Sequence, residues 1–257
     1  MNPVRAPGRR GAYVAARVRT VYRAWSAASG RIRVTDRGAE RRLIVRGDTL
    51  SIYRTDGNWT PVRREYWWKA LEVVDIPRRP SALLVGLGGG TQIHLLHQVA
   101  APRLITVIEH DPIIVRIARE WFGLDRITRL EILCTDAETA IRGLARAGRR
   151  FDYVMDDVSY ADAPLIALPK LLTLAPLVAR RGSLVVNRHR NGDPRVLARA
   201  LRFYFRRVRI RRIRRTGENT LICCAGPMVS RASDGGASAP RRAGARTASG
   251  ASDALEP

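Results

Sequence analysis

Lysine is almost absent from this chain, and acidic residues are few. Only Lys69 and Lys170 are lysines among 46 basic side chains, and 23 acidic side chains leave a formal net charge of +23. Such a surplus of positive charge provides sequence-independent affinity for nucleic acid. A genome whose base composition favours arginine, alanine and glycine codons explains the same composition, and the Ala/Arg/Gly-rich stretch at 230–257 agrees with that explanation. The charge alone leaves both explanations open.

Cysteine and long hydrophobic runs are also scarce. Cys134, Cys223 and Cys224 lie in apolar, strand-like segments, which predicts buried thiols and a reducing, cytoplasmic compartment. No apolar run approaches the ~20 residues that a membrane-spanning helix needs. No apolar stretch of signal-peptide length follows the basic N-terminus. We therefore expect neither a transmembrane segment nor a secretory signal, whereas the apolar share of 46% suits a large globular core.

The first 60 residues divide into a basic segment and a β-rich one. Residues 1–12 are rich in Pro, Gly and Arg, which predicts disorder. Apolar residues at helical spacing follow over 13–27 and predict a short basic helix docked on the domain. From 31 to 53 apolar and polar residues alternate between turns, which predicts three short antiparallel strands. We assign 1–29 to a basic, partly helical segment and 30–60 to a small β-meander subdomain.

Residues 61–228 alternate strand and helix patterns after a first helical segment at 65–74. Strands are predicted at 83–86, 104–109, 130–134, 153–157 and 183–187, with helices at 92–100, 112–121, 137–147 and 165–179 and a fifth helix that follows 193–195 and runs through 205. Two last strands, 208–213 and 220–225, form a hairpin joined by 216–219. This order predicts an α/β fold with a doubly wound, mostly parallel, seven-stranded Rossmann-like sheet whose last strand is antiparallel, so that the closing hairpin gives an antiparallel edge. Residues 229–257 lack large apolar side chains and are predicted to form a disordered tail.

The first strand of this sheet runs directly into a glycine-rich turn. Ala82–Val85 is an unbroken apolar run, as expected of a strand buried on both faces, and Gly86, Gly88, Gly89 and Gly90 follow it. Glycine lets the backbone turn sharply and approach a ligand closely. The N-terminus of the following helix offers free N–H groups. The turn predicts a nucleotide-type ligand, although a tight turn without a ligand has the same pattern.

Acidic residues gather at the predicted carboxyl ends of the strands, where ligands of open α/β sheets bind. Seven of the chain's 23 acids lie there, namely Glu109, Asp111, Asp136, Glu138, Asp156, Asp157 and Asp162. We expect Glu109 to accept hydrogen bonds from ribose hydroxyls and Asp111 to cap the next helix. Asp136 suits either an adenine amino group or a helix cap. Asp157 would face the reacting centre as a proton or amine acceptor, while strand alternation turns Asp156 away from it.

The spacing of two histidines and a series of arginines give weaker evidence for a metal site and for a phosphate-binding surface. His94 and His97 lie three residues apart on a predicted helix, but no third ligand has matching spacing, so no metal site is predicted. Arginines recur across the last helix and strand at positions 199, 202, 206, 207, 209, 211, 212, 214 and 215. They form either a solvated face, which we favour, or a surface that contacts phosphates. No aromatic ladder accompanies them.

Seven short motifs follow one another along the chain, and their order is informative. They are the meander end Leu50-Ser51, Glu65-Tyr66, Val85-Gly-Leu-Gly-Gly-Gly90, Val107-Ile-Glu-His-Asp111, Cys134-Thr-Asp136, Phe151-Asp-Tyr-Val-Met-Asp-Asp157 and Gly182-Ser-Leu-Val-Val-Asn187. In this order the chain resembles the spermidine synthase family of polyamine aminopropyltransferases, within the class I S-adenosylmethionine-dependent methyltransferase fold. The resemblance covers roughly residues 30–226. Each motif alone is moderately specific, and the ordered set with its N-terminal meander is much more so.

The resemblance implies group transfer from a sulfonium nucleoside, either S-adenosylmethionine or its decarboxylated form, to an amine or another nucleophile, with no metal. It implies that Glu109 holds the ribose and that Asp136, with Ala137, holds the adenine. The glycine turn would pack against the thioether. Asp157 would act as base or amine anchor, because the attacking amine must be deprotonated. The implied acceptor-binding residues are Tyr66, Tyr160 and Asp162.

Four departures from the family pattern affect the acceptor side. One is Tyr66-Trp67-Trp68-Lys69, which stands where the family has a stretch of tyrosine, histidine or glutamine, and glutamate. Gly89 stands where the family usually has an aspartate that binds the substrate amine, Leu50 replaces a glutamine, and Tyr160 replaces a second aspartate. The missing acids weaken the case for a polycationic acceptor. The nucleoside positions, Glu109 and Asp136, are retained.

Three function hypotheses follow from the sequence. The first is a spermidine synthase-like transferase that moves an aminopropyl or methyl group. The second is a methyltransferase that acts on nucleic acid through the arginine-rich surface. The third is a non-catalytic homologue that keeps the nucleoside site. The strand edges of the meander also offer a surface for a homodimer.

Overall fold

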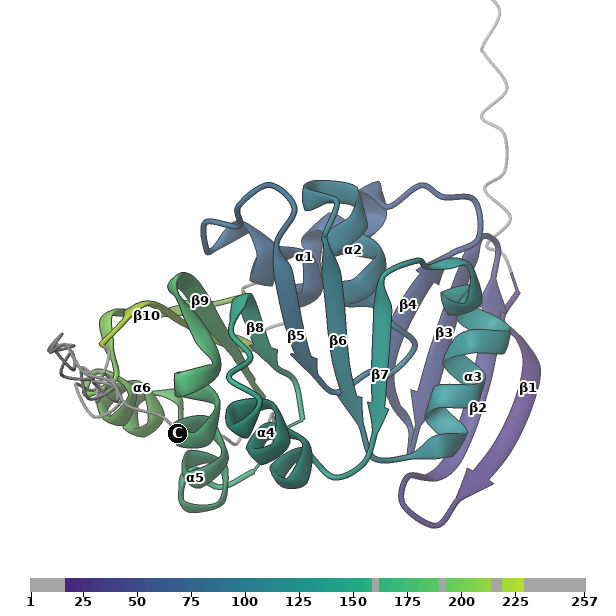
Figure 1. The fold of residues 1–257 in the computed structure, drawn as a ribbon. Coiled ribbons are helices and arrows are strands. Elements are labelled where there is room, and N and C mark those ends of the chain that lie inside the picture. The colour runs from purple at the N-terminus through teal and green to yellow at the C-terminus, as the bar shows by residue number, and fades with distance from the viewer. Residues whose placement is uncertain (1–16, 159–161, 190–192, 214–218, 229–257) are drawn as a thin grey trace, which may run out of the picture.

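The structure, a computed structural model, describes residues 17–158, 162–189, 193–213 and 219–228. It contains a four-stranded antiparallel sheet and a seven-stranded mixed sheet, shown side by side in Figure 1. No helix in these ranges is long and apolar enough to cross a membrane. The predictions at 1–12 and 229–257, and most of the hairpin loop at 216–219, fall outside the described residues.

The N-terminal sheet has four strands rather than the predicted three. Its strands are β1 (Arg19–Ser26), β2 (Gly30–Arg37), β3 (Glu40–Val45) and β4 (Asp48–Arg54), paired in sequence order. The helix predicted over 13–27 is therefore wrong wherever the structure describes it. A turn over 27–29 leads into Gly30, whose φ is +74°, and folds the segment back onto β2. The apolar residues have helical spacing, but cross-strand pairing with β2 stabilises this segment as a strand.

The seven-stranded sheet has the order β10-β11-β9-β8-β5-β6-β7. Its strands are β5 (Ser81–Val85), β6 (Leu104–Glu109), β7 (Leu130–Cys134), β8 (Phe151–Asp156), β9 (Val178–Arg188), β10 (Phe205–Arg212) and β11 (Thr220–Pro227). The predicted doubly wound, mostly parallel sheet is confirmed. The antiparallel last strand is confirmed too, because β11 pairs antiparallel with both β9 and β10, and the closing hairpin leaves β10 at the edge. A strand inserted this way makes β10 run in the same direction as β9.

Helices cover both faces of this sheet (Figure 1). They are α1 (Tyr66–Glu72), α2 (Thr91–Ala100), α3 (Pro112–Phe122), α4 (Ala137–Arg146), α5 (Pro164–Leu174) and α6 (Pro194–Leu201), with short 3₁₀ turns η1 (Thr60–Arg64), η2 (Leu124–Arg126) and η3 (Ala175–Leu177). One apolar core lies between the sheet and α1 and α2, and another between the sheet and α4, α5 and α6. A third joins α3 to the N-terminal sheet. The last two helices end earlier than predicted, since Val178 and Phe205 already belong to strands.

The cysteines divide between the two faces of the sheet and its edge. Cys223 and Cys224 are buried in the cores on opposite faces, as strand alternation predicts. Cys134 is exposed, so the prediction that it is buried is wrong. It is the last residue of β7, which lies at the opposite edge of the sheet from β10, and no further strand covers it.

Candidate active site

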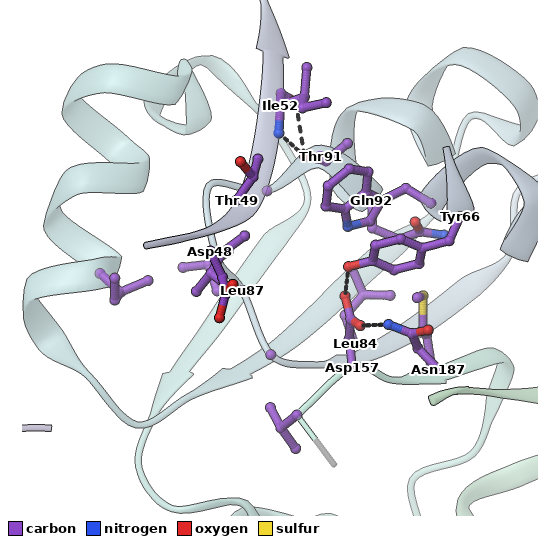
Figure 2. Close-up of a pocket in the computed structure, with 18 of the residues that line it drawn as sticks. Asp48, Thr49, Ile52, Tyr66, Leu84, Leu87, Thr91, Gln92, Asp157 and Asn187 are labelled. Carbon is purple, nitrogen blue, oxygen red and sulfur yellow. Dashed lines mark hydrogen bonds between the residues drawn. The ribbon is translucent and has the colours of Figure 1, made fainter. Parts of the chain in front are cut away.

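A cavity of about 760 Å³ opens at the carboxyl ends of β5, β6 and β8, with β4 and α1 completing its walls (Figure 2). The strand order reverses between β5 and β8, where open α/β sheets bind their ligands. Six of the residues predicted to form the site line this cavity, namely Tyr66, Gly86, Gly88, Gly90, Glu109 and Asp157. The topology therefore brings together residues that lie up to 91 positions apart in the chain.

The glycine turn is held by the N-terminal sheet. The Oγ atom of Ser51 accepts a hydrogen bond of 2.7 Å from the backbone N–H of Gly89. Gly88 has a φ of +52°, and a Cβ there would lie 2.6 Å from the Ser51 Oγ. Both the backbone conformation and the close approach of Ser51 therefore require glycine at position 88.

Gly89 does not line the cavity, because it faces the interior. A Cβ at this position would lie 2.6 Å from the ring of Phe122, which is fully buried at the end of α3. The aspartate of the family pattern has no room here. The substitution noticed in the sequence is thus coupled to the packing of α3 beneath the turn.

A second contact joins β4 to the start of α2. The Thr91 hydroxyl donates to the carbonyl oxygen of Ile52 (2.8 Å) and accepts from its N–H (2.9 Å), as Figure 2 shows. Thr91 and Ile52 are 2% and 6% exposed. One side chain therefore satisfies two buried backbone groups of the N-terminal sheet.

Replacing Thr91 with valine is expected to lower the free energy of unfolding by about 1–3 kcal/mol, because buried backbone groups of Ile52 lose their partner. Urea denaturation followed by circular dichroism measures this change. Thr55→Val is the control, since its hydroxyl bonds the Ala39 carbonyl at an exposed site, and we expect an effect within about 0.5 kcal/mol. Equal effects of the two substitutions would show that the contact does not hold the sheets together.

Glu109 links the turn to the end of β6. It is 8% exposed; its Oε2 accepts from the Leu87 N–H (3.2 Å) and its Oε1 from the Asp111 N–H (3.0 Å). The imidazole Nδ1 of His110 lies 3.2 Å from Oε1. The carboxylate is thus held in one orientation at the cavity wall. Its role toward a ribose stays a prediction.

Asp157 lies at the centre of a polar network. Its Oδ2 accepts from the Tyr66 hydroxyl (2.8 Å) and its Oδ1 from the Asn187 amide (2.7 Å), and both side chains point toward it in Figure 2. Asn219 in turn donates to the Asn187 oxygen at 3.0 Å. Because Asn187 accepts there, its amino group is directed at Asp157. The network holds the carboxylate in place beside the cavity.

The environment of Asp157 raises its pKa to about 7. Burial of the carboxyl is the largest cause, since it disfavours the charged form. The hydrogen bonds from Asn187 and Tyr66 oppose this effect, and the charge of Asp156 adds to it. A carboxyl with this pKa exchanges a proton near neutral pH, which is the property of a general base.

The remaining predicted residues lie elsewhere. Asp136 caps α4 by accepting from the Thr139 N–H (2.9 Å), and neither it nor Ala137 lines the cavity. Asp162 also lies outside the lining; its carboxylate is 3.9 Å from the Lys170 ammonium, and its carbonyl accepts from Arg188. Asp111 caps α3 as predicted. Tyr160 falls outside the described residues.

The site residues predicted from the sequence do not include several polar residues of this site. Among them are four whose hydrogen bonds build it, namely Ser51, Thr91, Asn187 and Asn219. Asn187 follows the same rule as the carboxylates, a polar residue near the carboxyl end of a central strand, and that rule would have found it. Asn219 carries no such signal, since only the β9–β11 pairing brings it there. Among the described residues, no three His, Cys, Asp or Glu side chains gather as a metal-ligand set.

Solved structures share this architecture. Spermidine synthase from Thermotoga maritima superposes with a TM-score of 0.61 over 81% of this chain and 72% of its own, at 14% identity. Human methyltransferase-like protein 13 in complex with SAH superposes with a TM-score of 0.52 over 63% of this chain and 82% of its own, at 24% identity. This is the class I methyltransferase fold. The resemblance noted in the sequence is therefore confirmed at the level of the fold.

Curated relatives of this methyltransferase-fold chain are transferases. The eEF1A lysine and N-terminal methyltransferase of Danio rerio is 36% identical over 86 residues, which are 33% of this chain and 12% of that protein. The polyamine aminopropyltransferase of Vibrio vulnificus is 25% identical over 114 residues, 43% of this chain and 38% of that protein. The chain thus matches only a minor part of each relative. No family model matches the chain.

Proposed function

We propose that this protein transfers a methyl or aminopropyl group from a sulfonium nucleoside to an amine, with Asp157 as the proton acceptor. The observation that carries the proposal is the Asp157 carboxyl, which has a pKa of about 7 and lies between Tyr66 and Asn187 at the cavity wall. Solved neighbours of the same fold hold SAH or the transition-state analogue AdoDATO. The three unpaired thiols suit a reducing cytoplasm.

The donor would occupy the side of the cavity formed by the glycine turn. There Glu109 accepts hydrogen bonds from the ribose, while the backbone at Gly86 and Gly88 approaches the thioether. The cap at α4 uses Oδ1 of Asp136, so its Oδ2 is the oxygen offered to the adenine amino group. Asp136 would then reach the adenine from outside the present cavity lining.

The acceptor amine would approach from the side of Tyr66 and Asp157. Its nitrogen lone pair forms a bond to the carbon attached to the sulfonium, and the carbon–sulfur bond breaks with its electrons moving to sulfur. The proton lost by the nitrogen passes to the Asp157 carboxylate. Since the thioether leaves as a neutral molecule, positioning and one base suffice.

The packing at Gly89 bears on the choice of acceptor. No side chain fits between this residue and Phe122, so the acid that binds a substrate amine in the family pattern is missing here. An acceptor with a single amine suits this cavity better than a polycation. The relatives named as lysine and N-terminal methyltransferases agree with an amine of this kind.

Calorimetric titration with S-adenosylmethionine, its decarboxylated form and methylthioadenosine tests the proposal. Tighter binding of the intact donor supports methyl transfer, whereas tighter binding of the decarboxylated donor supports aminopropyl transfer. Glu109→Gln is the matched variant, and we expect it to weaken whichever donor binds. Absence of binding by all three compounds would overturn the transferase proposal and leave a fold without this activity.

The transfer rate is expected to rise with pH through about 7, because Asp157 accepts a proton only when ionised. Tyr66→Phe removes a hydrogen bond that favours the charged carboxylate, so the rising limb of the profile should move to higher pH. The measurement is kcat/KM across about pH 5.5 to 8.5. A flat profile would contradict a base with this pKa.

A further inference from the structure

The edge strand β10 carries an unusual concentration of positive charge. Five of its eight residues are exposed arginines, namely Arg206, Arg207, Arg209, Arg211 and Arg212. Within the described ranges none of the five forms a salt bridge. Arginines elsewhere find acids when these are close, as Arg41 does with Asp36 (2.8 Å) and Arg54 with Asp56 (2.6 Å). Arg211 lies close enough to Glu72 for the two charges to interact. The other four arginines of β10 make no salt bridge with the described acids, so their charge is available to a ligand.

Exposed aromatic rings stand beside these arginines. The turn between α6 and β10 presents Phe203, which is 79% exposed, and Tyr204, which is 38% exposed. A hollow of about 430 Å³ lies next to the turn, and its lining includes four arginines, namely Arg202, Arg206, Arg207 and Arg209. The sequence showed no aromatic ladder here, and the structure places one pair of rings at the start of the arginine strand.

The arginines and the exposed aromatic ring together indicate which kind of partner this surface binds. Arginines on an edge strand also prevent unwanted strand pairing, and that function alone would explain their presence. It does not explain a large aromatic side chain left in solvent beside a hollow. Guanidinium groups match phosphates, and an open ring stacks on an unpaired base, so the two features together suit single-stranded nucleic acid. An acidic protein segment would use the arginines and leave Phe203 without a role.

The direction of β10 relates this surface to the cavity. Because antiparallel β11 separates them, β10 runs parallel to β9 and ends at the same edge of the sheet as Asp157. Asn219, which precedes β11, lines the cavity itself. At about 3.3 Å per residue, the eight residues of β10 span roughly 25 Å. Strand β10 therefore leads from the turn that holds Phe203 to the edge of the sheet at which the candidate active site lies.

We propose that β10 and the turn Phe203–Tyr204 form a binding surface for single-stranded nucleic acid. The phosphates contact Arg207, Arg209 and Arg211, which alternate along one face of the strand, and a base stacks on Phe203. This binding needs neither a donor nor Asp157. Its failure would leave the transferase proposal intact, and failure of that proposal would leave the surface.

The test is fluorescence anisotropy of a labelled single-stranded RNA of mixed sequence with the full chain, measured over a series of salt concentrations. We expect the logarithm of the affinity to fall linearly with the logarithm of salt. Replacing Arg207, Arg209 and Arg211 together with glutamine should make the slope shallower by about 2, since each lost phosphate contact on a single strand contributes about 0.7. Circular dichroism confirms that each variant folds.

Two comparisons make the result specific. The control variant replaces Arg126, Arg146 and Arg150 with glutamine; these exposed arginines lie on other elements, and the net charge changes equally. Its slope should stay that of the unmodified chain. Phe203→Ala should weaken RNA binding by about five- to a hundred-fold at every salt concentration without changing the slope.

Two outcomes would overturn the proposal. Equal slopes for the β10 variant and the control would show that overall charge, and not this strand, attracts RNA. Binding of poly-glutamate as tightly as RNA, with no effect of Phe203→Ala on either, would instead indicate an acidic protein partner.

Discussion

The Asp157→Asn variant is expected to transfer its group about 10²–10⁴-fold more slowly than the unmodified protein, with donor affinity nearly unchanged. The asparagine keeps the size of the side chain and its position beside Tyr66 and Asn187, but it cannot take the proton of the attacking amine. Single-turnover rates measure the loss, and calorimetry with the donor measures binding. Asp75→Asn, an exposed substitution of the same type, is the control and should leave both quantities unchanged.

Two results would contradict the role of Asp157 as base. Retention of most of the rate would place proton transfer on another group. A parallel loss of donor binding would show that the residue shapes the cavity and that the lower rate follows from that.

Asn219→Asp adds an independent check, because a carboxylate at 219 accepts from the Asn187 amino group and turns its oxygen toward Asp157. That change should raise the pKa of Asp157 and move the rate profile to higher pH.

The Arg188→Met variant is expected to lose about 3–5 kcal/mol of unfolding free energy. Arg188 and Asp156 are both fully buried at the ends of β9 and β8, and their opposite charges attract each other. The guanidinium also donates to the carbonyl of Asp162. Removing it takes away a positive charge that stabilises the buried Asp156 carboxylate. Urea denaturation gives the change, and Arg103→Met is the control, since its exposed pair with Asp152 should contribute less than about 1 kcal/mol.

The double variant Asp156→Asn/Arg188→Met separates the attraction between the two charges from simple packing. If the buried carboxylate causes the loss, the double variant should be more stable than Arg188→Met alone, and the two substitutions should not add. Additive losses would show that Arg188 stabilises the fold through packing and its contact with Asp162. The comparison requires only stability measurements, so it is independent of any proposed activity.

The sequence by itself determined the layers of the fold and the edge where the site lies. The alternation of strand and helix patterns is local, and parallel strands carry their carboxyl ends to one edge whatever their order. For that reason Glu109 and Asp157 were placed at the cavity by chain position alone. The cap at Asp111 was equally local, because it depends on residues within one helical turn.

Only the tertiary structure decided the features that depend on distant partners. The segment at β1 has apolar residues at helical spacing, yet pairing with β2 makes it a strand. The insertion of β11 beside β9 brings Asn219 to Asn187 and leaves the arginines of β10 at an open edge. The packing of Phe122 excludes any side chain at Gly89. Each of these features depends on contacts between residues far apart in the chain. The pattern of neighbouring residues does not report such contacts, so it could not predict these features.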